Sequence, residues 1–315
     1  MAPAPEADAA RAADIKAREA LALMLRGDAA AGLALYEQCL RSVTNLPAGR
    51  HIELLERAGK AETAAALRDL NLAHGINIAR VGMGLDGTPI DPIAEYDALF
   101  AQGMVNPRMV RDFTIALSQR EQPDRVAALL DPDRLLRIVY LDPALAPAAR
   151  DFLLAEEPRA ELREAEVSGR QMRRIDGLEK KPALAALFTA LLEETERYIA
   201  DWAASDHPLA SQGPSRIALH SWGQISRGTG FHVAHVHYRG WATGVFYPVD
   251  PEQPGGELCV GRPANIAEDA RGWPEAKIRP QAGMLILMPS FYTHWTAPLA
   301  QPGLRMAIAF DALRV

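Results

Sequence analysis

Three of the chain's eight histidines lie within six residues, in the segment FHVAHVHYRGWATGVFY that spans residues 231–247. Side chains on a β-strand alternate between the two faces, so His235 and His237 are expected on one face and His232 on the other. Neutral imidazole is a strong ligand for divalent iron, zinc and copper. Two imidazoles spaced in this way can occupy two neighbouring positions of one ion. The segment therefore predicts a metal site.

A second segment, AGMLILMPSFYTHWTAPLAQPGLRMAIAF, carries His294 and, eleven residues later, Arg305. On an alternating strand Arg305 shares a face with Ala307 and Ala309, and these small side chains leave room for a bound acid. A guanidinium group stays charged when buried and binds a carboxylate through two parallel hydrogen bonds. Histidines from two strands followed by a lone arginine thus indicate a metal site beside an anion site.

At these residues the chain resembles the Fe(II)- and 2-oxoglutarate-dependent oxygenases, specifically a small bacterial branch of that family. The resemblance covers about the last third of the chain and rests on spaced motifs. These motifs are Ser221-Trp222, Gly228–Gly230, His235-Val236-His237, Gly244-Val245-Phe246-Tyr247, Pro251–Leu258 and Pro280–Arg305. It implies a double-stranded β-helix (jelly-roll), with Fe(II) as metal and 2-oxoglutarate and O2 as cosubstrates. It also implies that Arg305 binds the distal carboxylate of 2-oxoglutarate.

The metal ligands depart from the pattern of the wider superfamily, which is H-x-D/E followed by a distant histidine. Here His237 occupies the position of the carboxylate, and residues 207–249 contain no Asp or Glu. We therefore expect a three-histidine site of His235, His237 and His294. Three alternatives stay open: two histidine ligands completed by water, ligation by His232 through a local bulge, or purely structural histidines.

Further candidates for the wall of the pocket are Trp222, Gln224, Tyr247 and Arg262. Trp222 and Tyr247 could equally be core aromatics. Arg262 could equally be a solvated turn residue. The chain shows no Ser-His-Asp order, no C-x-x-C pair and no close pair of carboxylates, so hydrolase and thiol-redox chemistry are disfavoured.

The fold class expected is α+β, with a helical domain at residues 1–130 and a jelly-roll domain at residues 131–315. Residues 10–130 are rich in Ala, Leu, Arg and Glu, which favours helices. Two glycine-centred breaks, at Gly27 and Gly59, are 32 residues apart, close to the 34-residue period of tetratricopeptide repeats. The helical domain is therefore interpreted as tetratricopeptide-like. Such arrays often bind a peptide, although plain scaffolding is the alternative.

In the second domain we expect a buried strand at residues 135–141, helices at 146–156 and 181–202, and short strands from residue 216 onward. These strands are RIALHSWGQI, FHVAHVHY, ATGVFYPV, GELCV, GMLILMP and RMAIAF. Their length and the Gly/Pro turns between them are typical of a sandwich or barrel. The glycines of VGMGLDGTP, Gly82, Gly84 and Gly87, are interpreted as a loop, because no Lys-Ser/Thr follows them as in a phosphate-binding loop.

Charge and cysteine content bound the remaining classes. The net charge of −6 disfavours nucleic-acid binding, which needs a basic face. No apolar run is long enough to cross a membrane, and the N-terminus lacks the pattern of a signal peptide. Two cysteines, Cys39 and Cys259, do not make a disulfide framework. These features together predict a cytoplasmic protein, while its oligomeric state cannot be read from the sequence.

The function expected is that of a 2-oxoglutarate-dependent dioxygenase that hydroxylates a C–H bond of a peptide, protein or small molecule, releasing succinate and CO2. One alternative is a cupin-like three-histidine metalloenzyme that does not use 2-oxoglutarate. Another is a non-catalytic module that binds a partner through its helices.

Overall fold

The computed structural model describes residues 5–42, 51–52, 54–55, 58–73, 91–101, 103, 105–165, 169–210, 213–237, 239–263, 266 and 269–315. The chain divides into two compact units, Met1–Gln102 and Gly103–Arg314. This division falls 28 residues before the boundary predicted at Asp131. Residues 103–130 join the second unit because they pack on its other parts; for example, the indole N–H of Trp273 donates to Ser118 Oγ at 2.9 Å.

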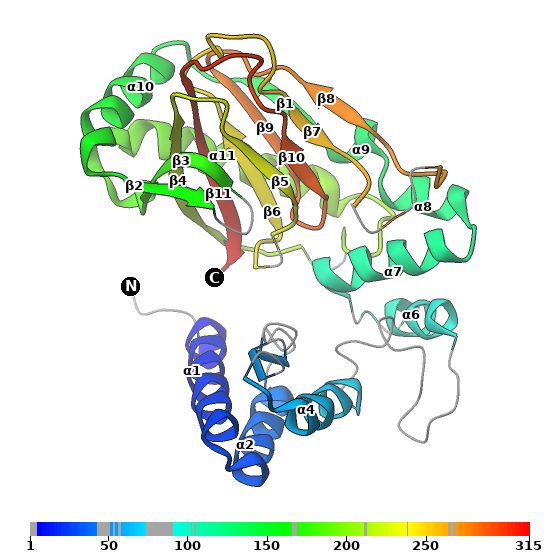
Figure 1. The fold of residues 1–315 in the computed structure, drawn as a ribbon. Coiled ribbons are helices and arrows are strands. Elements are labelled where there is room, and N and C mark those ends of the chain that lie inside the picture. The colour runs from blue at the N-terminus through cyan, green and yellow to red at the C-terminus, as the bar shows by residue number, and fades with distance from the viewer. Residues whose placement is uncertain are drawn as a thin grey trace. The chain divides into compact units, whose positions relative to one another are not determined.

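The first unit contains the helices α1 (Pro5–Arg26), α2 (Ala29–Ser42), α4 (Ala61–Ala73) and α6 (Pro92–Ala101) (Figure 1). Gly27 and Gly59 have φ angles of 102° and 72°. Only glycine adopts this backbone region readily, so these residues end a helix and begin the next turn. The core consists of apolar side chains from α1, α2 and α4 together with Ile52 and Leu55. Helix pairs are thus present, whereas the tetratricopeptide-like repeat stays a prediction and Gly82, Gly84 and Gly87 lie outside the described residues.

The helices of the second unit are α7 (Pro107–Gln119), α8 (Pro123–Leu129), α9 (Pro132–Leu135), α10 (Leu145–Glu156) and α11 (Ala185–Ala203). Helix α7 begins where Asn106 Oδ1 accepts the N–H of Met109 at 3.0 Å and Pro107 occupies the first turn. This combination satisfies a free N–H group and fixes φ for the helix. Short 3-10 turns η2 (Leu178–Lys180) and η3 (Pro182–Leu184) precede α11, which therefore starts later than predicted.

The described strands form one antiparallel sheet in the order β1-β9-β6-β11-β4-β3-β5-β10-β7-β8, with β2 paired to β3. Their bounds are β1 (Arg137–Tyr140), β2 (Glu161–Ala165), β3 (Gly169–Asp176), β4 (Ile217–Ser226), β5 (Phe231–His235), β6 (Ala242–Phe246), β7 (Leu258–Val260), β8 (Ala276–Ile278), β9 (Met284–Pro289), β10 (His294–Thr296) and β11 (Arg305–Arg314). The strands predicted after residue 216 are confirmed. The strand expected to carry His294 is β10, whereas the sequence did not predict β2, β3 or β8.

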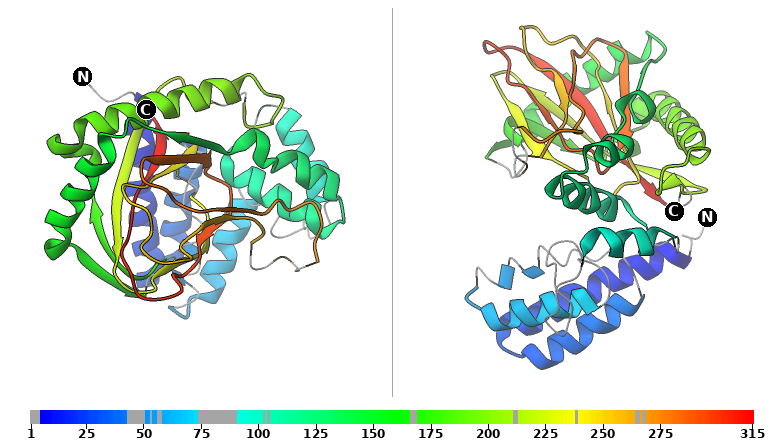
Figure 2. Two further views of the ribbon diagram at one scale, coloured as in Figure 1. Left: turned by 90° about the horizontal axis from the view of Figure 1, so that it is seen from above. Right: turned by 90° about the vertical axis from the view of Figure 1, so that its right-hand side faces the viewer.

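The sheet folds over so that two of its parts face each other across one cavity. One wall comes from β4, β6 and β11, and the other from β5, β7 and β10. Helices α10 and α11 pack together, and α11 covers β4 and β6 (Figures 1 and 2). This mixture of helices and an antiparallel sheet that encloses a cavity agrees with the predicted double-stranded β-helix.

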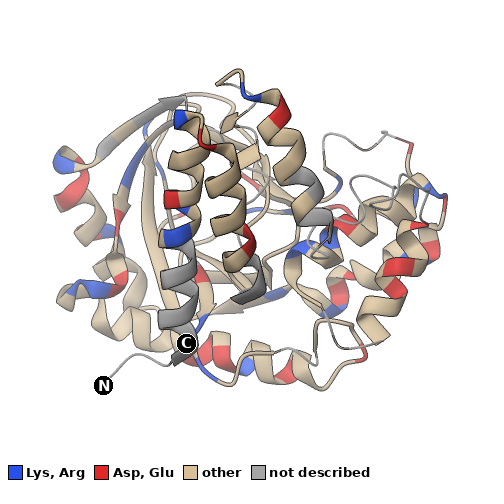
Figure 3. Cartoon of the chain, turned by 90° about the horizontal axis from the view of Figure 1, so that it is seen from below, with Lys and Arg blue, Asp and Glu red and all other residues tan. Residues whose placement is uncertain are grey.

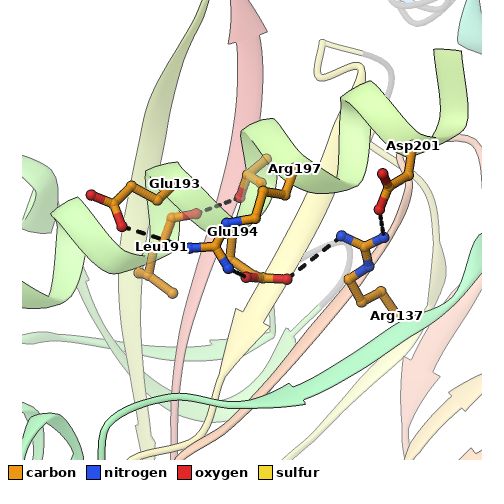
Figure 4. A network of polar contacts seen from close by, with 7 residues as sticks. Arg137, Leu191, Glu193, Glu194, Arg197 and Asp201 are labelled. Atoms are coloured by element: carbon orange, nitrogen blue, oxygen red, sulfur yellow. Dashed lines mark hydrogen bonds and ion pairs between the residues drawn. The ribbon is translucent and has the colours of Figure 1, made fainter.

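The strand predicted to be buried at residues 135–141 is instead a half-exposed edge strand. Strand β1 pairs only with β9 among the described strands, and Ile138 and Tyr140 are 46% and 58% exposed. Its apolar run misled the prediction, because an edge strand packs only one face. The polar contacts of Arg137 with Asp201 and with Glu194 (3.5 Å) tie β1 to α11 (Figure 4).

Acidic and basic residues are interspersed along the helices rather than gathered by sign (Figure 3). In the described part of the chain, no helix has the length and apolar character needed to span a bilayer. Cys39 and Cys259 are both buried.

Candidate metal and anion site

A cavity lies between the two walls of the sheet. The cavity is lined by Met172, Trp222, Gln224, Ser226, His232, His235, His237, Thr243, Val245, Tyr247, Leu258, His294, Trp295, Thr296, Arg305, Ala307 and Ala309. The two sequence segments singled out above, 231–247 and 282–310, thus meet in one place.

The predicted ligands His235, His237 and His294 converge. Each offers one nitrogen such that the three atoms lie within 4.8 Å of one another. Strand pairing brings them together, because His294 of β10 is the register partner of His235 of β5. His237 follows the end of β5, and its backbone N–H donates to the carbonyl of Ser290 at 3.0 Å. The backbone therefore positions all three imidazoles from two segments about 60 residues apart.

Each of the three imidazoles uses the same ring nitrogen, Nδ1, to contact the protein. Nδ1 of His235 lies 2.7 Å from the carbonyl oxygen of Val233, and Nδ1 of His294 lies 2.9 Å from that of Tyr292. Since a carbonyl only accepts, Nδ1 carries the proton in both residues, and Nε2 keeps a free electron pair. Among the described residues no hydrogen bond uses the Nε2 atom of either ring. A metal ion needs such an orientation of its ligands.

Burial keeps the imidazoles of His235 and His294 neutral. It is the main cause that lowers the pKa of His235 to about 4, with the neighbouring His237 adding to the effect. Burial also holds the pKa of His294 well below its usual range, and the nearby His235 and His237 lower it further. At neutral pH both rings are therefore unprotonated at Nε2, as metal ligation requires.

The third imidazole, His237, has a carboxylate partner that sequence reasoning missed. Its Nδ1 lies 2.7 Å from Oδ1 of Asp311, on β11. Residues 207–249 indeed contain no Asp or Glu. The fold instead brings a carboxylate to His237 from a residue 74 positions away in the sequence. Alternation along β11 could have shown that Asp311 shares the face of Arg305, Ala307 and Ala309, although not that it lies beside His237. Asp311 is not a member of the ligand group.

The prediction that His232 points away from the other histidines is wrong. His232 lines the same cavity, and its ring centroid lies 5.7 Å from that of His235. The pairing of β5 with β10 shifts register between His232 and His235, so strict alternation breaks down. His232 Nε2 lies 2.9 Å from the amide nitrogen of Gln224, and it does not join the three-histidine group.

Arg305 is buried at the wall of the cavity without an acidic partner. Its side chain is only 6% exposed, and Nη1 donates to the carbonyl of Ala297 at 3.2 Å. Among the described residues no Asp or Glu oxygen lies within ion-pairing distance of it. Burial lowers the pKa of Arg305 below its usual value. A buried cation without a counter-charge is costly, so the site favours an anionic ligand.

Two buried hydroxyl groups lie on the same wall as Arg305. Tyr247 Oη and Ser226 Oγ have no hydrogen-bond partner among the residues that the structure describes, although both residues line the cavity. Ser226 is the register partner of Arg305 across β4 and β11. Burial raises the pKa of Tyr247, so its hydroxyl stays protonated and can donate. Unpaired buried donors beside a guanidinium group match the oxygens of a bound carboxylate.

Of the remaining pocket candidates, two line the cavity and one does not. Trp222 and Gln224 line the cavity, and the Trp222 indole stacks on the His237 ring with centroids 5.6 Å apart. Arg262 is not among the lining residues, and its guanidinium donates to the carbonyl of Ile266 instead. This candidate is therefore corrected: its turn directs the side chain back onto the local backbone.

Residues 220–311, just under a third of the chain, match a family described as "Putative 2OG-Fe(II) oxygenase". All the histidines of the site, Arg305 and Asp311 lie within the matched segment. The match identifies an oxygenase enzyme that uses Fe(II) and 2-oxoglutarate. No curated protein matches the chain.

Solved structures with a similar fold include a prolyl-4-hydroxylase of Pseudomonas putida, with 18% identity over 60% of this chain and 98% of that chain and a TM-score of 0.44. A prolyl hydroxylase of Trichoplax adhaerens, in complex with a peptide fragment of the hypoxia inducible factor oxygen degradation domain, has 14% identity over 62% and 92%, with a TM-score of 0.43. HygX of Streptomyces hygroscopicus, with nickel and 2-oxoglutarate bound, has 15% identity over 59% and 85%, with a TM-score of 0.38. The family match, rather than these distant likenesses, supports the functional conclusion.

The site of this oxygenase fits both groups that its family match implies. Three imidazoles with convergent nitrogens form a donor set suited to Fe(II). The buried Arg305 and the unpaired hydroxyls of Tyr247 and Ser226 suit the carboxylate of a small acid. Metal and acid sites share one cavity, so a single ligand can contact both.

Proposed function

We propose that this oxygenase is a dioxygenase with a three-histidine iron site that hydroxylates a C–H bond of its substrate. The observation that carries the proposal is Arg305, a buried guanidinium without an acidic partner, in the same cavity as His235, His237 and His294. A cosubstrate that is both a metal chelator and a dicarboxylic acid needs both parts.

The side chains would divide the work between the two ends of the cosubstrate. The three histidines hold the metal, while Arg305 binds the distal carboxylate with Tyr247 and Ser226 as further donors. When bound, Fe(II) with 2-oxoglutarate and O2 supplies the oxidation of the C–H bond, and 2-oxoglutarate is converted to succinate and CO2.

Other residues of the cavity leave room and exclude water. Ala307 and Ala309 stand between Arg305 and Asp311 on the cavity face of β11, where larger side chains would fill the space of the acid. Met172, Val245 and Leu258 supply apolar wall. A dry wall strengthens the attraction between the guanidinium group and the carboxylate.

Anaerobic titration of the Fe(II)-loaded protein with 2-oxoglutarate tests this function. Chelation of the metal by the 2-oxo acid should produce a weak visible charge-transfer band that saturates near one equivalent per chain. Added O2 should then yield succinate. A protein that binds Fe(II) tightly yet shows neither the band nor succinate would contradict the proposal.

That outcome would favour the second candidate, a cupin-like three-histidine enzyme that does not use 2-oxoglutarate. The observation in its favour is the donor set itself, since no carboxylate belongs to the group that could hold the metal among the described residues. Arg305 would then bind an acidic substrate, and the titration separates the two possibilities.

For the substrate, we propose a peptide or protein side chain that the helical unit Met1–Gln102 recruits. The support is its set of paired helices with Gly27 and Gly59 at matching turns, since helical repeats commonly present a peptide-binding groove. Plain scaffolding around a small-molecule enzyme is the alternative.

A chain that starts at Gly103 separates these two readings. Starting at Asp131 instead would remove Ser118 and Leu129, which bond to Trp273 and His207 in the sheet-bearing unit. If the helices recruit a macromolecule, the shortened protein should keep Fe(II) and 2-oxoglutarate binding and slow uncoupled succinate formation, but lose turnover of the native substrate. Full stimulation by that substrate in an iron-replete shortened protein would exclude the peptide proposal.

A further inference from the structure

Asp311 is a buried carboxylate that the proposed function does not yet use. It is 7% exposed and sits on β11, six residues beyond Arg305 on the same face of the strand. In the described part of the chain it has no Lys or Arg within ion-pairing distance. Its close partners are the imidazole of His237 and the hydroxyl of Thr243. A buried acid kept beside one imidazole indicates a role in holding that ring.

The contacts of Asp311 determine which nitrogen of His237 carries the proton. Oδ1 of Asp311 lies 2.7 Å from His237 Nδ1 and accepts the hydroxyl of Thr243 at 3.0 Å. A carboxylate only accepts, so it favours the proton on Nδ1 and leaves the electron pair of Nε2 for a ligand. Carbonyl oxygens do the same for His235 and His294. His237 is the one of the three that has a charged partner.

The surroundings leave room for this carboxylate. A Cβ atom at Gly240 would lie 3.2 Å from Cβ of Asp311 and 2.9 Å from the carbonyl oxygen of Ala242. Glycine at position 240 therefore allows the segment after His237 to pass close to β11. The ring of His237 also stacks on the indole of Trp222, with an angle of 19° between the two planes. The ring is thus fixed by a stack, a hydrogen bond and its own backbone contact with Ser290.

We infer that Asp311 is a positioning residue for His237: it fixes the ring in the Nδ1–H form and leaves the electron pair of Nε2 available to the metal. In the more common H-x-D/E pattern a carboxylate would bind the metal directly. Here the negative charge of Asp311 would act through the imidazole ring of His237 instead. This inference rests on the proposed three-histidine site.

Cobalt(II) titration of the metal-free full-length protein tests the inference, because visible Co(II) absorption reports both affinity and coordination. Asp311→Asn keeps the size of the side chain and removes its charge, and it should weaken Co(II) binding by about 10- to 100-fold, as loss of a ligand's hydrogen-bond partner does. Thr243→Val is the matched control. It removes the other donor to the same oxygen but leaves the charge, so its effect should stay below about tenfold.

Nitrogen NMR of the metal-free protein supplies a readout that a merely structural role would not change. With His237 assigned by comparison with His237→Gln, the parent should show the Nδ1–H tautomer, and Asp311→Asn should show a mixture or the Nε2–H tautomer. An Nε2–H ring in the parent protein would overturn the inference, even if Asp311→Asn failed to fold.

The outcomes also separate this inference from the proposed site. If His237→Ala loses Co(II) while Asp311→Asn binds it as tightly as the parent, the positioning role is wrong and the three-histidine site stands. If His237→Ala binds as tightly as the parent, the proposed ligand set fails and the role of Asp311 fails with it. If Asp311→Asn loses binding and His237→Ala retains it, Asp311 is itself a ligand, which also overturns the inference.

Discussion

His207 and the histidines of the cavity lie in the same unit, the former and His294 buried and the others partly buried, yet they differ in what their ring nitrogens contact. His207 uses both: Nε2 donates to the carbonyl of Leu129 at 3.3 Å, and Nδ1 accepts the N–H of Leu209 at 3.1 Å. Its ring stacks on Phe291 at 10°. His235 and His294 use only Nδ1 and direct Nε2 toward their neighbours. A structural histidine satisfies itself within the protein, whereas a ligand histidine keeps one nitrogen free.

The same distinction separates the arginines. Arg262 donates to a nearby carbonyl and Arg137 contacts two carboxylates on α11, so neither needs a ligand. Arg305 is more deeply buried, and within the described ranges its only partners are a carbonyl and a distant sulfur. Bonding capacity left over after folding, rather than residue type, therefore marks the functional side chains.

The largest effect is expected from removing a free nitrogen. His294→Ala or His235→Ala should weaken Fe(II) binding by more than the roughly 10- to 100-fold that the loss of a ligand's hydrogen-bond partner costs. His207→Phe, which removes an equally buried but satisfied imidazole, should leave the iron content at about one per chain. Iron analysis after anaerobic reconstitution and dialysis measures both. Equal iron in the parent and in both ligand variants would erase the distinction between the two kinds of histidine.

The next effect concerns the arginine without a counter-charge. Arg305→Ala should weaken 2-oxoglutarate binding by tenfold or more, since losing a charge-assisted contact in a desolvated pocket costs about 2–5 kcal/mol. Fe(II) should stay bound. Arg262→Ala, the matched control outside the cavity, should keep the affinity of the parent. Isothermal titration of the iron-loaded proteins gives both values, and the same loss in both variants would indicate a general change of charge instead.

His207, whose two ring nitrogens both have partners in the protein, should make the free energy of unfolding depend on pH. Burial lowers the pKa of His207 to about 4, whereas the unfolded chain binds its proton with a pKa near 6.5. As pH falls from 6.5 to 4, the imidazole of His207 becomes protonated in the unfolded state but stays neutral in the folded state. The free energy of unfolding should therefore fall across this window by roughly 3 kcal/mol from this residue alone.

His207→Phe should remove that part of the pH dependence while keeping the aromatic stack. Urea unfolding of the metal-free protein at several pH values between 4 and 7 gives the slopes. An identical slope in His207→Phe and the parent would show that another group controls acid unfolding.

The smallest effect is expected at His232, which lies in the cavity but outside the ligand group. Its ring nitrogens face Gln224 and Thr296, so it resembles His207 in being satisfied by the protein. His232→Ala should weaken Fe(II) binding by less than tenfold, below the cost of losing a ligand's partner. A loss as large as that of His294→Ala would add His232 to the metal ligands.

Local periodicity carried the predictions that the structure confirms. Arg305, Ala307 and Ala309 line the cavity together because alternation along a strand depends only on the strand itself. The helices around Gly27 and the convergence of His235 with His237 follow from short-range patterns in the same way. The structure also confirms His294 in the group, a residue that the sequence suggested through its motif rather than through geometry.

Only the tertiary structure decided what depends on the pairing of distant strands. The register of β11 with β6 sets Asp311 against Thr243 and beside His237, a pairing that no local pattern contains. A register shift between β5 and β10 turns His232 into the cavity against the alternation rule. The unpaired hydroxyls of Tyr247 and Ser226 likewise became visible only when all their neighbours were in place. The sequence by itself thus determined which side chains can bind a metal and an acid. The fold determined which of them keep that capacity, because burial and strand register give the other side chains hydrogen-bond partners within the protein.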